Sequence, residues 1–215
     1  MTELRETGLR PGEPVAIVRL DDLAEAVAIG QALVKGGIRV LEFTLTNPDA
    51  LKAVGEVRDR LEDRALVGAG TVLDSESAGE AISAGALFLV THIYRRDVIE
   101  RGLEGGVPVV SGAMSPTEIF AAWQDGADLV KVFPARSLGP AYVKDLLGPL
   151  PQLRLVPTGG VNLDNCAAFI EAGAYTVALG SNLVDEAVIS SGDWGALSAQ
   201  AKRYVEACAA ASPRG

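Results

Sequence analysis

The feature that most limits how this chain can fold is a phrase that recurs along it. In each copy a helical stretch ends in a small residue and a glycine, and a short apolar run follows. A glycine in this place adopts the left-handed conformation that ends a helix and returns the chain to a strand. These glycines fall at positions 37, 85, 106, 126 and 173, so their intervals are 48, 21, 20 and 47 residues. Two intervals are close to double the others, which indicates a unit of about 20 to 24 residues, one helix plus one strand.

Eight such units fit the length of the chain. The predicted strands cover residues 15–19, 40–43, 65–68, 87–90, 107–110, 129–133, 153–157 and 176–179, and the segments between them have helical character. Strands that alternate with helices over short connections are typical of the α/β class and predict a (β/α)8 TIM barrel. The alternative is an open doubly wound sheet, which requires a glycine-rich first turn between strand and helix. Residues 19–22 contain no glycine, so the barrel is favoured.

Several helix boundaries can also be predicted. Apolar residues recur at helical spacing over residues 22–34. Asp74 or Ser75 is expected to cap the third helix, and Ser115 followed by Pro116 begins the fifth. The last helix is expected over residues 193–210, and an extra N-terminal helix over residues 1–9. The length of 215 residues suits a single domain over 1–215, with 1–13 as an N-terminal extension or helix.

Composition narrows the functional classes. The chain has 19 basic and 28 acidic residues, a net charge of −9, and an acidic chain without a basic stripe is a poor binder of nucleic acid. Its two cysteines, Cys166 and Cys208, and its one histidine, His92, lack the spacing of a metal site, so no metal or other cofactor is expected. No apolar run reaches the ~20 residues that cross a bilayer, and residues 1–13 lack a signal-peptide core. We therefore expect a cytoplasmic protein with no nucleic-acid or membrane partner.

Two glycine-containing turns indicate a phosphate site. In a barrel the active site lies at the carboxyl ends of the strands, and phosphate often binds after the seventh and eighth. Gly159 and Gly160 follow the seventh predicted strand, and Gly180 and Ser181 follow the eighth. Closely spaced backbone N–H groups with no side chain in the way cradle a phosphate, to which the hydroxyls of Thr158 and Ser181 can add contacts. Two ordinary glycine turns are the alternative.

Lys131 interrupts an apolar run that predicts a buried strand. Lysine is almost never fully buried unless paired, although at a strand edge its stem can pack while its ammonium reaches water. Burial pushes an amine toward its neutral form, and a neutral lysine attacks carbonyls to form a Schiff base. Glu42 also follows apolar residues on its strand, and a carboxyl group near the lysine can transfer protons. A structural ion pair between the two is the alternative.

Arg19 lies at the end of the first predicted strand. Its guanidinium can bind a carboxylate with two parallel hydrogen bonds. Alternatively, Arg19 is a surface residue that pairs with Asp21 or Asp22.

Together these residues resemble the class I 2-keto-3-deoxy-6-phosphogluconate (KDPG) aldolases and their 6-phosphogalactonate and 4-hydroxy-2-oxoglutarate aldolase relatives. The resemblance extends over nearly the whole chain, from about Pro14 to Val205, and its motifs are specific in combination. They are LEFTLT at 41–46, VGAGTV at 67–72, KVFPA at 131–135, PTGGV at 157–161 and Gly-Ser at 180–181.

The resemblance implies a lyase in which Lys131 forms the Schiff base and Glu42 is the general acid and base. The phosphate loops of the family fall on Gly159, Gly160 and Ser181. The implied substrate is a phosphorylated 2-keto-3-deoxy sugar acid, KDPG, which is cleaved to pyruvate and glyceraldehyde 3-phosphate in the Entner–Doudoroff route of carbohydrate metabolism. The family also implies a homotrimer without a metal.

Other substrate contacts are implied less directly. Some family members carry a carboxylate-binding arginine at the place of Thr46, whereas others carry it at the end of the first strand, which fits Arg19. Thr71 is expected to hold the same carboxylate. Phe133 and Thr158 are expected to line the substrate pocket.

The chain departs from the family pattern in two loops expected to face the substrate. After the fourth strand the family usually has Ser-Pro or Thr-Pro, and this chain has Thr91 and His92. After the fifth strand it usually has Pro-Gly, and this chain has Ser111 and Gly112. We expect His92 to form part of the pocket wall rather than to act as a catalyst.

Three alternative functions are consistent with the sequence. The substrate can be 2-keto-3-deoxy-6-phosphogalactonate or 4-hydroxy-2-oxoglutarate. The chain can be an isomerase or synthase that uses Glu42 as a base and Lys131 only as a charge. It can also be a non-catalytic barrel that binds a phosphorylated ligand, although such a barrel has little reason to keep both residues at their cost in stability.

Overall fold

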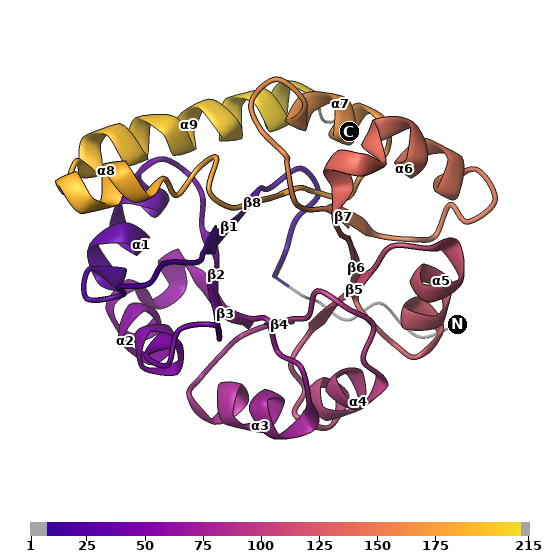
Figure 1. Ribbon diagram of the computed structural model, residues 1–215, viewed down its shortest axis with the longest axis horizontal. Coiled ribbons are helices and arrows are strands. Elements are labelled where there is room, and N and C mark those ends of the chain that lie inside the picture. Colours follow the sequence, from indigo (N-terminus) through magenta and orange to yellow (C-terminus); the bar gives the residue numbers. More distant parts are fainter. Residues whose placement is uncertain (1–7, 212–215) are drawn as a thin grey trace.

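Eight parallel strands form a ring that is surrounded by helices in this computed structural model, which describes residues 8–211 (Figure 1). The strands are β1 (Val15–Val18), β2 (Val40–Thr44), β3 (Leu66–Gly70), β4 (Leu89–Val90), β5 (Val109–Ala113), β6 (Leu129–Val132), β7 (Leu155–Pro157) and β8 (Ala178–Leu179). The α-helices are α1 (Ala26–Lys35), α2 (Ala50–Leu61), α3 (Ser75–Ser83), α4 (Arg96–Glu104), α5 (Pro116–Gln124), α6 (Gly139–Leu147), α7 (Cys166–Glu171), α8 (Glu186–Ser191) and α9 (Trp194–Ala211). Two short 3-10 helices are η1 (Glu62–Arg64) and η2 (Ala135–Ser137).

The ring is closed, which excludes the open doubly wound sheet. The strand order is β7-β6-β5-β4-β3-β2-β1-β8, so the first strand pairs with the last. A bridge between Thr158 and Ala178 joins the end of β7 to β8. The predicted (β/α)8 TIM barrel is therefore confirmed.

The strands separate two apolar cores because successive side chains point to opposite faces of a sheet. One set of alternating residues fills the barrel interior: Val15, Ile17, Val40, Phe88, Val90, Val110, Leu129, Val156 and Ala178. The other set, which includes Leu41, Phe43, Val130 and Val132, packs against the helices. This alternation decides which residues at the strand ends face the mouth of the barrel.

The N-terminal segment contacts the interior core at the end of the barrel opposite the mouth. Leu9 is buried in that core, and its carbonyl accepts a hydrogen bond from the Tyr175 hydroxyl at 2.9 Å. Gly12 N–H donates to the Tyr175 carbonyl at 2.7 Å. Residues 1–7 of the predicted N-terminal helix lie outside the described residues, and Gly8 and Leu9 are not helical.

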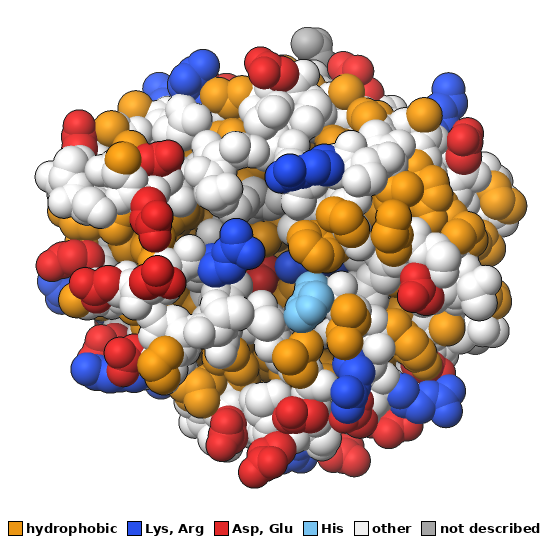
Figure 2. All heavy atoms as spheres, in the orientation of Figure 1, with side chains coloured by type: hydrophobic (Ala, Val, Ile, Leu, Met, Phe, Trp, Pro, Cys, Tyr) orange, Lys and Arg blue, Asp and Glu red, His pale blue; other side chains and the backbone are white. Residues whose placement is uncertain are grey.

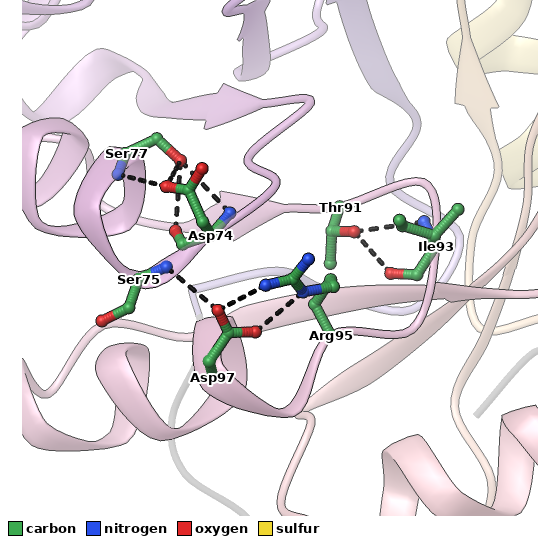
Figure 3. Close-up of polar contacts among 7 residues, drawn as sticks. All are labelled: Asp74, Ser75, Ser77, Thr91, Ile93, Arg95 and Asp97. Atoms are coloured by element: carbon green, nitrogen blue, oxygen red, sulfur yellow. Dashed lines mark hydrogen bonds and ion pairs between the residues drawn. The ribbon is translucent and has the colours of Figure 1, made fainter.

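Two predicted helix starts are confirmed in side-chain detail. Asp74 caps α3 and accepts a hydrogen bond from Ser77 N–H at 2.8 Å (Figure 3). Ser115 caps α5 in a capping box with Glu118, with Pro116 in the first turn. The predicted last helix is α9, which packs against α1 and α7. No described helix is both long and apolar enough to cross a membrane.

Two of the strand ends that differ from the prediction lie near the mouth of the barrel, and one helix is additional. β3 extends to Gly70 and β5 to Ala113, so Gly70 and Gly112 lie within strands instead of after them. Both are buried, and the neighbouring strands supply the pairing that the turn-like sequence does not suggest. The short helix α8 was not predicted, because its six residues carry too little apolar periodicity to identify.

The interior core makes a direct prediction about stability. Phe88 is fully buried in the barrel, so Phe88→Ala should lower the free energy of unfolding by about 3–5 kcal/mol through lost packing and a cavity. Urea denaturation measures the change. Leu103→Ala is the control, because Leu103 is exposed on α4 and should change stability by about 0.5 kcal/mol or less. Equal effects of the two variants would contradict this assignment of the core.

Candidate active site

Lys131 and Glu42 meet inside the mouth of the barrel. On β6 and β2 each of them lies between two residues that face the helices, so both side chains point inward. Lys131 Nζ lies 3.6 Å from Glu42 Oε1. The two residues are 6% and 1% exposed, respectively. The structure therefore brings together the two residues that the sequence selects for chemistry.

The geometry of this pair does not favour a purely structural role. A separation of 3.6 Å is longer than an N–H···O hydrogen bond of about 2.7–3.2 Å. Glu42 Oε1 has no hydrogen-bond partner among the described residues. Burying two charges costs several kcal/mol per ion unless close geometry and further hydrogen bonds offset it. The pair is thus a weak source of stability but a suitable amine and proton acceptor.

Two glycines leave room for the carboxylate of Glu42 and for the loop after β4. Gly70 on β3 faces inward beside Glu42, and a Cβ atom there would lie 1.9 Å from Glu42 Oε1. Gly112 on β5 is paired in register with Lys131, and a Cβ atom there would lie 2.1 Å from the carbonyl carbon of His92. Only glycine permits the carboxylate and the loop after β4 to lie where they do. The sequence places both glycines at strand ends near the expected site but does not show that they make this room.

Ser111 is not brought to the mouth of the barrel. Val110 belongs to the interior core and Gly112 lies beside Lys131, so Ser111 between them points toward the helices. It is fully buried, and its hydroxyl has no hydrogen-bond partner within the described part of the chain. The expected substrate-facing position on this strand is occupied by Gly112 instead.

Thr91 shapes the loop after β4. Its hydroxyl accepts a hydrogen bond from Ile93 N–H at 3.1 Å and donates one to the Ile93 carbonyl (Figure 3). Arg95 in the same loop forms an ion pair with Asp97, whose carboxylate also accepts Ser75 N–H. Thr91 is buried, so its hydroxyl holds the turn that presents His92.

His92 and Phe133 form one wall beside the lysine. Their ring centroids are 6.2 Å apart in an edge-to-face arrangement, and Lys131 Nζ lies 5.8 Å from the centroid of the Phe133 ring. Burial lowers the pKa of His92 below its ordinary value of 6.5, and the positive charge of Lys131 lowers it further, while Glu42 raises it. The imidazole is therefore neutral at neutral pH, which agrees with the expected role as pocket wall.

The loops after β7 and β8 have the features expected of an anion cradle. Gly159 and Gly160 adopt φ angles of 86° and 83°, in the left-handed region that favours glycine. The N–H groups of Gly160, Gly180 and Ser181 donate to no other described residue. A Cβ atom on Gly180 would meet nothing within 4 Å, so the space above this loop is open. Thr158 borders the small cavity that also contacts Lys131 and Glu42.

Arg19, Thr46 and Ser181 line a cavity of about 490 Å³ at the mouth. Arg19 continues the inward alternation of Val15 and Ile17. It forms no ion pair with Asp21, Asp22 or any other described residue. The surface ion pair considered for Arg19 is therefore not formed.

Sequence reasoning missed Asn47, which also lines this cavity. Asn47 is buried and donates to the carbonyls of Leu20 and Asp21 at 3.0 and 2.9 Å, which ties the loop after β2 to the loop after β1. The Thr44 hydroxyl lies 3.0 Å from that of Thr46. The signal for Asn47 was its place in the loop that follows the strand of Glu42.

Thr71 is held in an unusual backbone conformation. Its φ angle is 60°, a genuine outlier for a β-branched residue. Strain of this kind costs of order 1–3 kcal/mol and clusters at functional sites. The residue directly follows Gly70, which supports its expected place at the site.

Charges are distributed unevenly over this face. In Figure 2, Lys and Arg side chains lie beside the central hollow that also exposes the histidine, and most Asp and Glu side chains lie toward the edge. A site can therefore attract an anion although the chain has a net charge of −9.

Known proteins resemble this chain over almost its full length. The family model described as KDPG and KHG aldolase matches residues 6–200. The 2-dehydro-3-deoxy-phosphogluconate aldolase of Treponema pallidum is 36% identical over 89% of this chain and 91% of its own. The 2-dehydro-3-deoxy-6-phosphogalactonate aldolase of Escherichia coli is 35% identical over 79% of this chain and 83% of its own. The solved KDPG aldolase of Legionella pneumophila, with pyruvate captured as a covalent carbinolamine intermediate, superposes with a TM-score of 0.79 at 29% identity and covers 96% of this chain and 100% of its own.

The lowered pKa of His92 predicts a pH dependence of stability. Because the folded-state pKa lies below 6.5, the unfolded chain binds a proton that the folded chain does not as pH falls through 6.5, and stability is lost. In His92→Gln this loss disappears, so the free energy of unfolding should fall less between pH 7 and pH 5.5 than in the wild type. Urea denaturation at both pH values measures the free energy of unfolding of each protein. An equal decrease in the wild type and in His92→Gln would contradict the assigned protonation state.

Proposed function

The chain belongs to the KDPG and KHG aldolase family, and on this premise we propose that it cleaves 2-keto-3-deoxy-6-phosphogluconate to pyruvate and glyceraldehyde 3-phosphate. It is an aldolase, and therefore a lyase. The observation that carries the proposal is the buried amine of Lys131 with the carboxylate of Glu42 at 3.6 Å. The Legionella relative, which holds pyruvate as a covalent carbinolamine, supports the same chemistry here.

The reaction begins with attack of the Lys131 amine on the C2 ketone. The resulting carbinolamine loses water and becomes an iminium, with C2 double-bonded to Nζ. Glu42 is the group next to Nζ that can take up and return protons during these steps. The low-dielectric interior strengthens the interaction between the carboxylate and the positive iminium.

Cleavage uses the iminium as an electron sink. The proton of the C4 hydroxyl passes to Glu42, the C3–C4 bond breaks, and its electron pair moves into the iminium to give an enamine. The aldehyde that leaves is glyceraldehyde 3-phosphate. Glu42 then returns its proton to C3, and water hydrolyses the new iminium to release pyruvate and the free lysine.

The remaining residues bind the two ends of the substrate. Arg19 and Thr71 hold the carboxylate of the pyruvoyl part. Thr46 lines the cavity that Arg19 also lines. The N–H groups of Gly160, Gly180 and Ser181, together with Gly159, cradle the phosphate. Phe133 covers the lysine, and Thr158 borders the cavity beside it.

The substrate can be tested by comparing pyruvate release from the gluconate-type, galactonate-type and unphosphorylated 2-keto-3-deoxy acids. We expect the highest kcat/KM for the gluconate-type phosphate. The galactonate-type relative is of similar identity, so a higher kcat/KM for that substrate would replace the gluconate assignment.

Lys131→Arg keeps the positive charge and should abolish release, whereas residual activity would contradict a Schiff-base mechanism and favour an electrostatic role.

Gly70→Ala tests the role of Glu42 without changing a polar group. The added Cβ would overlap Glu42 Oε1, so the carboxylate must move. We expect kcat to fall by about 10²- to 10⁴-fold, as for a misplaced general acid and base, with little change in folding. Gly55→Ala on α2 is the matched control, since its Cβ would meet only ordinary contacts. Full activity in Gly70→Ala would contradict this placement of Glu42.

We also propose that the chain is a cytoplasmic homotrimer. The support is a group of large apolar side chains exposed near the mouth, on the loops after β3, β4 and β5 and on α5: Leu73, Ile93, Met114 and Phe120. Contiguous exposed apolar surface marks protein interfaces. Light scattering should give three times the monomer mass, and Phe120→Glu should reduce it. A monomer at micromolar concentration would contradict the trimer.

A further inference from the structure

Arg136 is fixed against the loop that follows β7. It lies on η2, directly after the motif that contains Lys131. Ala135 N–H donates to the Thr158 carbonyl at 2.7 Å, and Arg136 N–H donates to the Gly159 carbonyl at 2.9 Å. On the other side of this loop, Asn165 Nδ2 donates to the Gly160 carbonyl at 3.1 Å. The backbone of Arg136 is thereby held in register with the glycine turn.

The side chain of Arg136 extends over Gly160. A Cβ atom placed on Gly160 would lie 2.5 Å from Arg136 Cβ and 3.0 Å from Arg136 Nε. The guanidinium therefore lies on the same side of the loop as the space directly above Gly160. No other residue that we have assigned to the cradle brings a positive charge to it.

Arg136 also lacks an acidic partner. Arg39, Arg58, Arg95, Arg96 and Arg101 each form an ion pair with Asp or Glu. Arg136 is exposed and forms none with the described residues. In a chain of net charge −9, a guanidinium beside unpaired backbone N–H groups is available for an anion.

We propose that Arg136 binds the terminal phosphate of the substrate together with the backbone N–H groups of this loop and so selects phosphorylated substrates. The inference rests on the proposed function, because it assigns the end of that substrate. A guanidinium forms parallel charge-assisted hydrogen bonds with phosphate oxygens. An unphosphorylated substrate presents a neutral hydroxyl at this point and gains nothing from the charge.

The test compares Arg136→Met with Arg203→Met, a control that removes an exposed arginine on α9. For the phosphorylated substrate, Arg136→Met should lower kcat/KM by about 10- to 100-fold, mostly through KM. For its unphosphorylated analogue kcat/KM should not change. Arg136→Lys should recover part of the loss, because it keeps the charge without the planar fork. Arg203→Met should match the wild type with both substrates.

Other outcomes overturn the assignment. An equal loss with both substrates would show that Arg136 only supports the loop, and no loss would show that it does not contact the phosphate. A wild type that cleaves none of the substrates would refute the proposed function separately. In that case calorimetry with inorganic phosphate tests Arg136 alone: Arg136→Met should weaken binding by at least about 10-fold, and unchanged binding would refute the role of Arg136.

Discussion

The close approach of Lys131 and Glu42 is the constraint on which the upper half of the barrel depends. Burying two charges 3.6 Å apart is costly unless close geometry and further hydrogen bonds offset their lost hydration. Their place explains why the inward position on β3 is Gly70, where a Cβ atom would collide with Glu42, whereas Gly112 on β5 leaves room for the backbone of His92. It also explains the division of the interior into an apolar lower layer and a polar mouth. The packed apolar core in the lower part of the barrel supports the reactive residues at the mouth.

The proposed function assigns the mouth three recognition tasks around this pair. The carboxylate end of the substrate is assigned to Arg19, at the cavity after β1 and β2. The phosphate end is assigned to the glycine N–H groups after β7 and β8, with Arg136 above Gly160. Between them, the rings of His92 and Phe133 form a wall. Burial lowers the pKa of His92, which keeps its imidazole neutral. The loop that carries His92 is held by the two hydrogen bonds between the Thr91 hydroxyl and the backbone of Ile93.

Much of this could be predicted from the sequence because it depends on local rules. Glycine spacing gave the repeating unit, and the apolar runs around Lys131 and Glu42 placed both residues on predicted strands. The rest depends on tertiary contacts. Ser111 and Gly112 read as a turn, yet pairing with β6 extends β5 through them and turns the serine hydroxyl toward the helices. Arg136 follows a recognisable motif, but only the docking of η2 on the β7 loop gives it a place. Asn47 likewise depends on a neighbouring loop for its partners.

The central claim is that Lys131 forms a covalent bond with a ketone. It is tested most directly by reducing the protein with borohydride in the presence of pyruvate and mapping the modified peptide by mass spectrometry. The account predicts that the reduced pyruvyl group is attached to Lys131 and that its yield falls sharply in Glu42→Gln. An unmodified Lys131, or an adduct of equal yield on an exposed lysine such as Lys52 or Lys202, would contradict it.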